Sequence, residues 1–394
     1  AAPSLISSVG FTDPALFSEE ALPEGVRVEV GTAETDFEPE FITVSPDGTT
    51  AFVALQENNA IAVLDIESGA FTGIFSTGIV DRSVEGQGFD PIEDSVIDIT
   101  TFDDIVSLRQ PDTIKATEIN GDTFVLTANE GDGRDDPEFG DPLTVNELRV
   151  RDLLNVELEH DLIARGLIAE EPFAFDEEGD PDREPIGIEE LEVSQFDGLD
   201  AHGRVELLHT YGSRSFTIWD AHGNVVFDSG DEFEKIIAER APGRFNDDDG
   251  DSGEDRSNDA GPEPEALEVG VIGDRTYAFI GLERDSGIMI YDITDPANAF
   301  FVNYIDPAFV GLTPEDEVAR HSPEGIVFIP AEESTTGFAQ IAVSYEFSGS
   351  TVVFDLPQLS LNEIRSDQGG PDNNEYIEIF GAAGTSLNGF SFVA

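Results

Sequence analysis

The sequence predicts an all-β protein, a β-propeller of about seven blades with one helical insertion. Three observations predict this fold class. Strand-like runs joined by tight turns recur along the chain, four of them share one opening motif, and helical periodicity is confined to one long segment. Antiparallel units of about 40–45 residues without intervening helices are typical of propeller blades. About 350 residues of such units give roughly seven blades, with six or eight as alternatives.

The repeated unit is recognised by its first two strands. Each copy opens with Pro, an acidic residue, a variable residue and an aliphatic residue, and continues through alternating apolar residues and a turn to a second apolar run. Gly, Asn and Asp in the turns supply the backbone conformations that hairpins need. The four openings lie at 39–42, 111–114, 264–267 and 323–326.

Later strands of the unit are less regular. Third strands end at Asp65, Asp292 and Asp355, whereas the copy at 110–134 runs into a polar insertion. Residues 203–230 match the later part of the unit, and their strand holds the single Trp, Trp219, which we expect in the core. An early strand at 25–30 is expected to close the ring by pairing near 350–356.

One segment departs from the strand pattern. Residues 144–171 carry apolar side chains at helical spacing, which predicts a helical insertion on one face of the ring. Acidic Gly/Pro-rich stretches at 85–94, 131–142, 175–185 and 246–263 are expected to be loops. We therefore predict a propeller over residues 1–358 and a partial β segment over 359–394, which is too short to bury a core of its own.

The composition limits the possible functions. The chain of 394 residues has 84 acidic and 19 basic residues, a net charge of −65 and no cysteine. This charge repels nucleic acids and anionic membranes, attracts cations and suits a halophilic or marine protein. Disulfides and thiolate metal sites are excluded, and no apolar run is long enough to span a membrane. The uncharged start, AAPSLISSVG, resembles a mature end after signal-peptide removal, which predicts a secreted protein.

The repeats carry acids at two fixed places. The first acids are Glu40, Asp112, Glu265 and Glu324, and the second acids, 17–22 residues later, are Glu57, Glu130, Glu283 and Glu346. A strand, a turn and a return strand bring both positions to the same side of a blade, so we expect eight carboxylates around one mouth of the ring. Close carboxylates repel one another, and a hard cation such as calcium removes that repulsion. The alternative is that these acids cap strand edges by pairing with backbone N–H groups or Arg.

Two basic residues are candidates for a catalytic role at this mouth. Arg214 stands where we expect a second acid, and its guanidinium either pairs with two carboxylates or grips an anionic ligand. His321 precedes the fourth opening and is a candidate acid or base, although a surface histidine is the alternative. The five histidines form no HExxH or HxH zinc motif.

The densest acidic loop, 246–265, is a second calcium candidate. Asp247, Asp249 and Asp251 have the spacing of the first ligands of a calcium loop, but Ser252 replaces the expected glycine. A solvated acidic loop is the alternative. The acids near 129–138 and 196–206 leave the same two interpretations open.

Five longer motifs resemble the choice-of-anchor I family of secreted bacterial β-propellers. They are NEGDGRD at 129–135, GSRSFTIWD at 212–220, DRSNDAGPEPE at 255–265, IGLER at 280–284 and SPEGIVFI at 322–329. The resemblance covers about residues 25–356 and implies a secreted or surface-attached, alkaline-phosphatase-like protein, while the tail resembles the start of a lamin-tail domain. In plan the chain is also similar to the calcium-dependent β-propeller phytases, a likeness of fold only.

Two functions therefore stay open. The first is a calcium-dependent hydrolase of small phosphate esters, with the acidic mouth holding calcium and Arg214 orienting the phosphate. The second is a non-catalytic surface or matrix module that calcium stiffens. The sequence makes no prediction of the oligomeric state or of the substrate.

Overall fold

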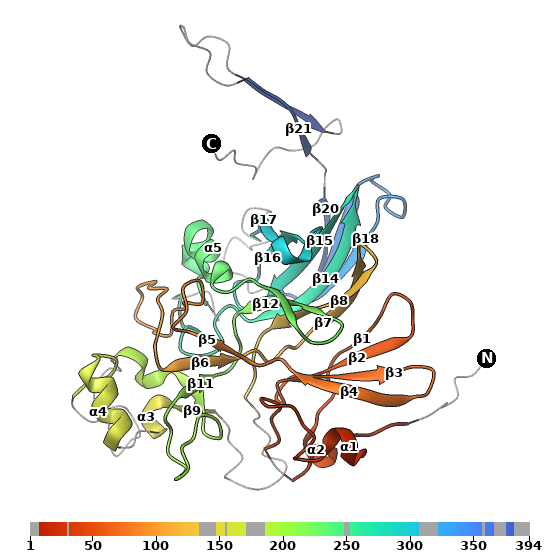
Figure 1. The fold of residues 1–394 in the computed structure, drawn as a ribbon. Coiled ribbons are helices and arrows are strands. Elements are labelled where there is room, and N and C mark those ends of the chain that lie inside the picture. The colour runs from red at the N-terminus through yellow and green to blue at the C-terminus, as the bar shows by residue number, and fades with distance from the viewer. Residues whose placement is uncertain are drawn as a thin grey trace.

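The computed structural model describes residues 8–29, 31–133, 147–153, 156–170, 186–247, 253–306, 322–356, 359–365 and 376–381. The described residues form five sheets of three or four strands and two two-stranded sheets. Four of the larger sheets are antiparallel meanders that follow one another face to face, as propeller blades do (Figure 1). The predicted all-β propeller class is confirmed.

The first blade contains β1 (Ile42–Val44), β2 (Thr50–Leu55), β3 (Ala60–Asp65) and β4 (Ala70–Ser76) in sheet order. Its first turn is fixed by Asp47, whose carboxylate accepts hydrogen bonds from the Ser45 hydroxyl and the Thr49 backbone. The short helices α1 (Pro14–Phe17) and α2 (Ala33–Asp36) lie beside this blade, and Phe11, Phe17 and Phe37 pack on its outer face.

The second blade is β7 (Ile114–Ile119), β8 (Asp122–Asn129), β12 (Ser215–Asp220) and β13 (Val225–Asp228). An insertion of more than eighty residues separates the second strand of this blade, β8, from the third, β12. The two strands nevertheless pair along their length, from Ser215–Asn129 to Asp220–Phe124. The strand that ends at Asp220 is therefore the missing third strand of the 110–134 copy. Trp219 is 2% exposed, and its indole N–H donates to Thr127, so its predicted core position is confirmed.

The third and fourth blades are adjacent in sequence. The third contains β14 (Pro264–Ile272), β15 (Arg275–Leu282), β16 (Ile288–Asp292) and β17 (Phe300–Ile305), with the 3-10 helix η4 (Pro296–Asn298) before the last strand. The fourth contains β18 (Pro323–Ile329), β19 (Ala339–Tyr345) and β20 (Ser350–Leu356). The hairpin of β21 (Leu359–Arg365) and β22 (Tyr376–Gly381) follows it.

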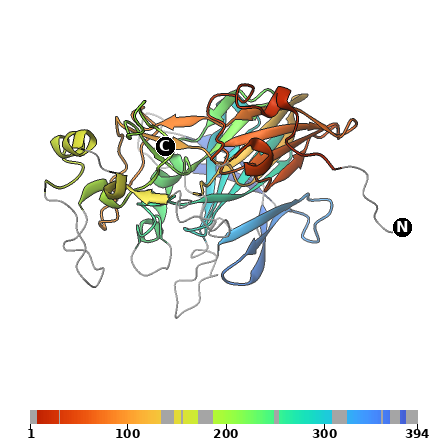
Figure 2. The same cartoon turned by 90° about the horizontal axis from the view of Figure 1, so that it is seen from below.

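Residues of the insertion and of the segment before β7 form a separate layer. The strand β6 (Ile105–Leu108) pairs with β5 (Ile79–Asp81) and, in parallel, with β11 (Leu208–Thr210). The pair β9 (Glu147–Arg149) and β10 (Glu192–Ser194) lies beside α3 (Val150–Leu153), α4 (Val156–Ala164) and the 3-10 helix η2 (Gly187–Glu190). Figure 2 shows this helical insertion on the opposite side from the first blade. Of the predicted helical segment 144–171, the described part is helical at Val150–Leu153 and Val156–Ala164, whereas Glu147–Arg149 form a strand and residues 165–170 lie in turns and bends.

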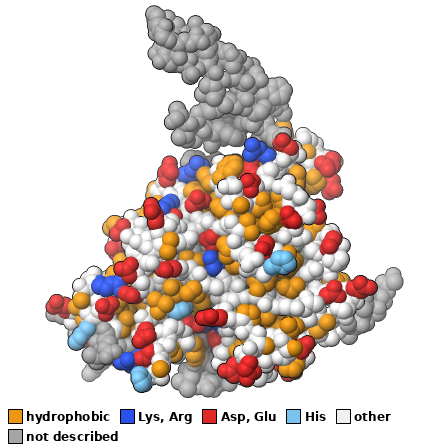
Figure 3. Space-filling model, viewed as in Figure 1, with side chains coloured by type: hydrophobic (Ala, Val, Ile, Leu, Met, Phe, Trp, Pro, Cys, Tyr) orange, Lys and Arg blue, Asp and Glu red, His pale blue; other side chains and the backbone are white. Residues whose placement is uncertain are grey.

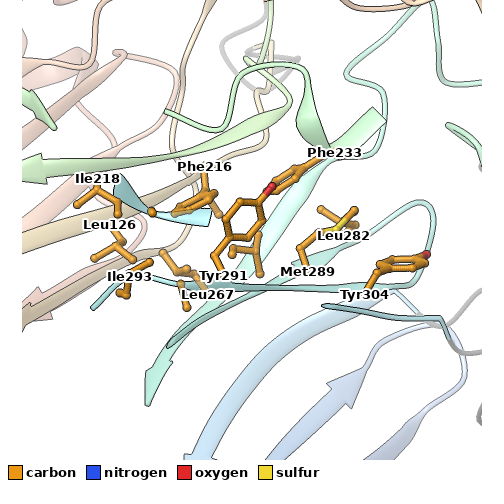
Figure 4. Close-up of a cluster of buried hydrophobic side chains, with 14 of the residues drawn as sticks. Leu126, Phe216, Ile218, Phe233, Leu267, Leu282, Met289, Tyr291, Ile293 and Tyr304 are labelled. Carbon is orange, nitrogen blue, oxygen red and sulfur yellow. The ribbon is translucent and has the colours of Figure 1, made fainter. Parts of the chain in front are cut away.

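Apolar side chains between successive blades form the core. The largest cluster joins the second and third blades through Phe216, Met289 and Tyr291, and α5 (Glu232–Arg240) adds Phe233 to it (Figure 4). Neither α5 nor the 3-10 helix η3 (Pro242–Arg244) that follows it was predicted from the sequence. Burying these side chains is the main source of stability in such a stack.

The predicted closing strand is wrong. Residues 26–29 have no strand structure, and the Arg27 N–H donates to the Asn58 carbonyl of the first blade. In the described part of the chain, β20 pairs with β19 and not with an N-terminal strand. The segment is held by the side chain of Arg27, as described below, which is why its alternating apolar pattern does not produce a sheet partner.

Candidate metal centre

Hairpin geometry gathers the repeated acids at one edge of the blades. Each first acid lies at or just before the start of a first strand, and each second acid lies one or two residues after the end of a second strand. The antiparallel register places these two ends beside each other, as in the pairs Pro264–Leu282 and Pro323–Tyr345. The structure therefore supports the predicted convergence, and the same edge of neighbouring blades brings their acids into range of one another.

Three carboxylates make the tightest group. Glu130 follows β8, Glu263 precedes β14 and Glu283 follows β15, and one oxygen from each lies within 4.8 Å of the others. Two oxygens on opposite sides of one calcium ion are at most about 5 Å apart, because each lies at about 2.3–2.6 Å from the ion. The spacing of these three carboxylates, from two blades, is therefore compatible with one shared cation of the size of calcium.

Protons are held in this group because the charges are close and shielded from water. Burial, followed by the negative charge of Glu263, raises the pKa of Glu130 well above its ordinary value. The same two causes raise the pKa of Glu283 to about 8. A cation would replace such protons, since it neutralises the carboxylates without the cost of bringing bare charges together.

A second group continues the cluster toward the first blade. The carboxyl groups of Glu40 and Glu57 share a hydrogen bond, which requires a proton on one of them. Partial burial of the carboxyl group, followed by the charge of Glu57, raises the pKa of Glu40 to about 8, although the residue as a whole is exposed. Asp112 lies near both, and burial raises its pKa to about 6.

Glu265 links these acids to the fourth blade. Its carboxyl group shares a hydrogen bond with that of Glu324, and burial together with the charge of Glu283 raises its pKa to about 10. The Oε2 atom of Glu265 is buried and accepts no hydrogen bond from the described part of the chain. A buried acceptor without a donor is costly, and a bound cation would satisfy it.

We use the term carboxylate cluster for the eight residues that interact in this way: Glu40, Glu57, Asp112, Glu130, Glu263, Glu265, Glu283 and Glu324. Seven of them were predicted from the repeat. The eighth predicted acid, Glu346, follows β19 at the same edge and is exposed, as Glu40 and Glu324 are, but it is not among the main charges that raise the pKa values of the other acids, so it lies outside the cluster. Its N–H donates to the Ser322 carbonyl.

Glu263 was missed because it lies one residue before the recurring Pro. It is 2% exposed, and its carboxylate is held by Arg256 at 2.6 Å and by Arg284 at 2.5 Å. Arg284 also contacts Glu283 at 3.1 Å. The sequence signal was the pair of acids in Glu263-Pro264-Glu265, which places two carboxylates on one strand start.

Close backbone contact fixes the position of Glu130. Gly131 and Gly212 both have positive φ angles, of 90° and 68°, where an L side chain is strained. A Cβ atom on Gly131 would lie 1.8 Å from the Gly212 nitrogen. The two glycines therefore let the end of β8 cross the segment before β12, directly beside Glu130.

The proposed role of Arg214 is not supported by its position. Arg214 directly precedes the third strand of its blade, β12, instead of following the second strand, and its N–H donates to the Asn129 carbonyl. Its side chain is 3% exposed and forms an ion pair with Glu234 at 2.6 Å. Its terminal nitrogens also donate to the carbonyls of Asp90, Ser257 and Asp259. A guanidinium enclosed in this way stabilises the fold and is not available to a phosphate, which corrects the sequence interpretation.

The remaining candidates are only partly described. His321, Asp249 and Asp251 lie outside the described residues. Asp247 is described and is 4% exposed. Its loop is closed at the base by bonds from the Glu254 N–H to the Phe245 carbonyl and from the Arg256 N–H to the Asn246 carbonyl. The predicted calcium loop therefore stays a prediction.

Blades in succession, with acids gathered at one edge, define the chain as a β-propeller with a carboxylate-rich edge. Residues 2–296 match the model of the choice-of-anchor I domain family, and the chain belongs to this family. It is 33% identical over 108 residues to Gigasin-3a of Magallana gigas, a match that covers 26% of this chain and 38% of that protein. The chain thus matches well under half the length of that relative.

Solved structures show distant similarity. A putative 6-phosphogluconolactonase from Bacteroides uniformis is 11% identical, with a TM-score of 0.32 over 87% of this chain and 55% of that chain. The WD40 domain of Toxoplasma gondii coronin is 8% identical, with a TM-score of 0.30 over 82% of this chain and 46% of that chain. TM-scores this low support no inference about activity. In the described part of the chain, no helix is long and apolar enough to cross a membrane.

Proposed function

We propose that this protein is an extracellular calcium-binding β-propeller whose carboxylate cluster holds calcium where the blades meet. The observation that carries the proposal is the spacing of Glu130, Glu263 and Glu283, whose oxygens lie within 4.8 Å of one another. Oxygen ligands at this spacing suit a large, hard cation. Membership in the choice-of-anchor I family supports the assignment to the cell exterior.

The charge of the whole molecule also favours a cation. The net charge is −65, and Figure 3 shows many acidic side chains and few basic ones on the viewed face. This field raises the local concentration of divalent cations and lowers that of anions. It does not select calcium by itself, so the selectivity has to come from the spacing of the cluster.

Bound calcium would join blades that are far apart in the sequence. Glu130 belongs to the second blade, whereas Glu263 and Glu283 belong to the third. A shared ion between them would replace carboxylate repulsion by attraction and stiffen the centre of the molecule. A non-catalytic surface or matrix module stabilised by calcium is thus the function that the geometry supports best.

Hydrolysis of small phosphate esters is a second candidate. The observation that favours it is the guanidinium of Arg284, which borders the tightest three carboxylates and is 18% exposed. Calcium at these carboxylates would supply positive charge for a substrate phosphate, and Arg284 would orient it in the place first assigned to Arg214. The described residues provide carboxylates as the only candidate bases beside this site.

Calorimetric titration of the chelator-treated protein with calcium tests the main proposal. We expect binding that weakens by about tenfold or more in Glu283→Gln, because a ligand charge is lost. Glu118→Gln is the matched control, since Glu118 is exposed on β7. Equal calcium affinities of the two variants would refute the assignment of the cluster.

A chromogenic phosphate ester tests the second candidate separately. Hydrolysis should require calcium and fall by about a hundredfold or more in Arg284→Met. Calcium binding without any hydrolysis would refute the phosphoesterase activity and support the non-catalytic function.

A further inference from the structure

A cavity lies outside the carboxylate cluster. It has a volume of about 660 Å³ and lies between the N-terminal segment 24–29, the facing ends of β5 and β6, and residues 196–197. Cavities of about 300–1,000 Å³ are of the size that holds small organic molecules. The roles proposed above do not use this cavity.

Partly exposed apolar side chains line the cavity. Val28, Ile79 and Phe196 line the cavity, and they are 37%, 45% and 42% exposed. Leu108 forms the base and is 2% exposed. Three large exposed apolar side chains from separate segments around one hollow provide a surface that an apolar ligand would cover.

The guanidinium in the wall is already engaged. Arg27 is 6% exposed, and it donates to the Asp197 carboxylate at 3.0 Å and to the Glu57 carbonyl at 2.6 Å. It also contacts Glu29 at 2.6 Å. Its positive charge is therefore offset by two carboxylates, and it offers little to an anionic ligand.

The other polar groups at the cavity favour positive charge. Glu24 lines the cavity beside Glu29 and Asp197, so the lining holds three acidic residues and one arginine. Burial lowers the pKa of His209, which leaves the imidazole neutral. With the His209 Nδ1–H donating to the Leu207 carbonyl, Nε2 is an acceptor.

We propose that this cavity binds a small organic cation, an amine with an apolar body. The apolar body would lie against Val28, Ile79 and Phe196, and the ammonium group would lie toward Glu24. The excess of carboxylates and the net charge of −65 select a cation over an anion of the same shape. This proposal does not depend on calcium binding.

The test compares three probes of one shape: the 2-phenylethylammonium ion, neutral 2-phenylethanol and 3-phenylpropanoate. Ligand-observed NMR and calorimetry on the full chain would measure their affinities. We expect the ammonium ion to bind about tenfold or more tightly than the carboxylate. Equal or tighter binding of 3-phenylpropanoate, or no binding of the ammonium probe at millimolar concentration, would overturn the proposal.

Two variants locate the site. Ile79→Trp fills the cavity and should abolish binding, whereas Val271→Trp, at a 58% exposed position on β14, is the matched control. Glu24→Gln should reduce the difference in affinity between the ammonium ion and the alcohol. Because Glu24 is exposed, this variant should fold as the native chain does. Binding that survives Ile79→Trp would contradict the assigned site. Glu283→Gln should leave the affinity for the amine unchanged, which separates this site from the calcium proposal.

Discussion

The free-energy cost of bringing the acids of the carboxylate cluster together depends on the protonation of individual carboxyl groups. Without a cation, Glu40 and Glu57 must share a proton, and Glu265 and Glu324 do the same. Such pairs are stable only while they keep that proton. The carboxylate cluster is therefore adapted either to acid conditions or to a bound cation, and we propose a bound cation.

A stability profile against pH follows from these groups. The folded-state pKa of Glu40 and of Glu283 is about 8, against an ordinary value of 4.5, so the folded state binds more protons than the unfolded chain between these values. In chelator, stability should therefore fall as the pH rises from about 4.5 to about 8. Thermal unfolding measures this, and calcium should flatten the fall. A slope that is the same in Glu283→Gln as in the native chain would contradict the prediction.

Arg214 provides a second prediction at this scale. Arg214→Met leaves Glu234 buried without its partner, so we expect a loss of about 3–5 kcal/mol in the free energy of unfolding. Adding Glu234→Met should recover part of this loss, because the unpaired charge is removed. Urea unfolding gives both values, and the calcium affinity of the folded variant should be unchanged. A weakened calcium affinity in Arg214→Met would show that Arg214 contributes to the calcium site after all.

At the scale of elements, the hairpin repeat accounts for what the sequence predicted well. The Pro-acid openings and the strands that follow them fix which strand ends meet, so seven members of the cluster were found without a structure. Long-range contacts explain the failures. Glu263 is held by Arg256 and Arg284, and Arg214 is held by three carbonyls from two distant segments, and neither set of partners has a local sequence pattern. The strand that ends at Asp220 was predicted, but its place in the same blade as the 110–134 copy was not, because the insertion separates it in sequence from its partner β8.

The close backbone crossing of Gly131 and Gly212 beside Glu130 allows a test of how the blade elements position the site. Gly131 and Gly121 have nearly equal φ angles, of 90° and 92°, but only Gly131 lacks room for a Cβ atom. Gly131→Ala should lower the free energy of unfolding by about 1–3 kcal/mol more than Gly121→Ala, because the backbones at the crossing must separate. It should also weaken calcium binding by moving Glu130. Equal effects of the two variants would show that the crossing does not position the site.

The whole molecule carries a charge of −65, so any salt reduces its self-repulsion. Specific binding must therefore be separated from screening. At equal ionic strength, calcium should raise the unfolding temperature more than sodium does, and this excess should be lost in Glu283→Gln and kept in Glu118→Gln. If sodium chloride reproduces the full effect of calcium, the stabilisation is general screening and not a site.

The central claim is that acids from separate blades bind one cation together. Anomalous scattering from crystals grown with saturating calcium tests it most directly, because it locates the ion and its ligands. We predict a calcium peak bounded by Glu130, Glu263 and Glu283, with carboxylate oxygens at about 2.3–2.6 Å. Calcium found only in peripheral loops, with these three carboxylates free of metal, would contradict the claim.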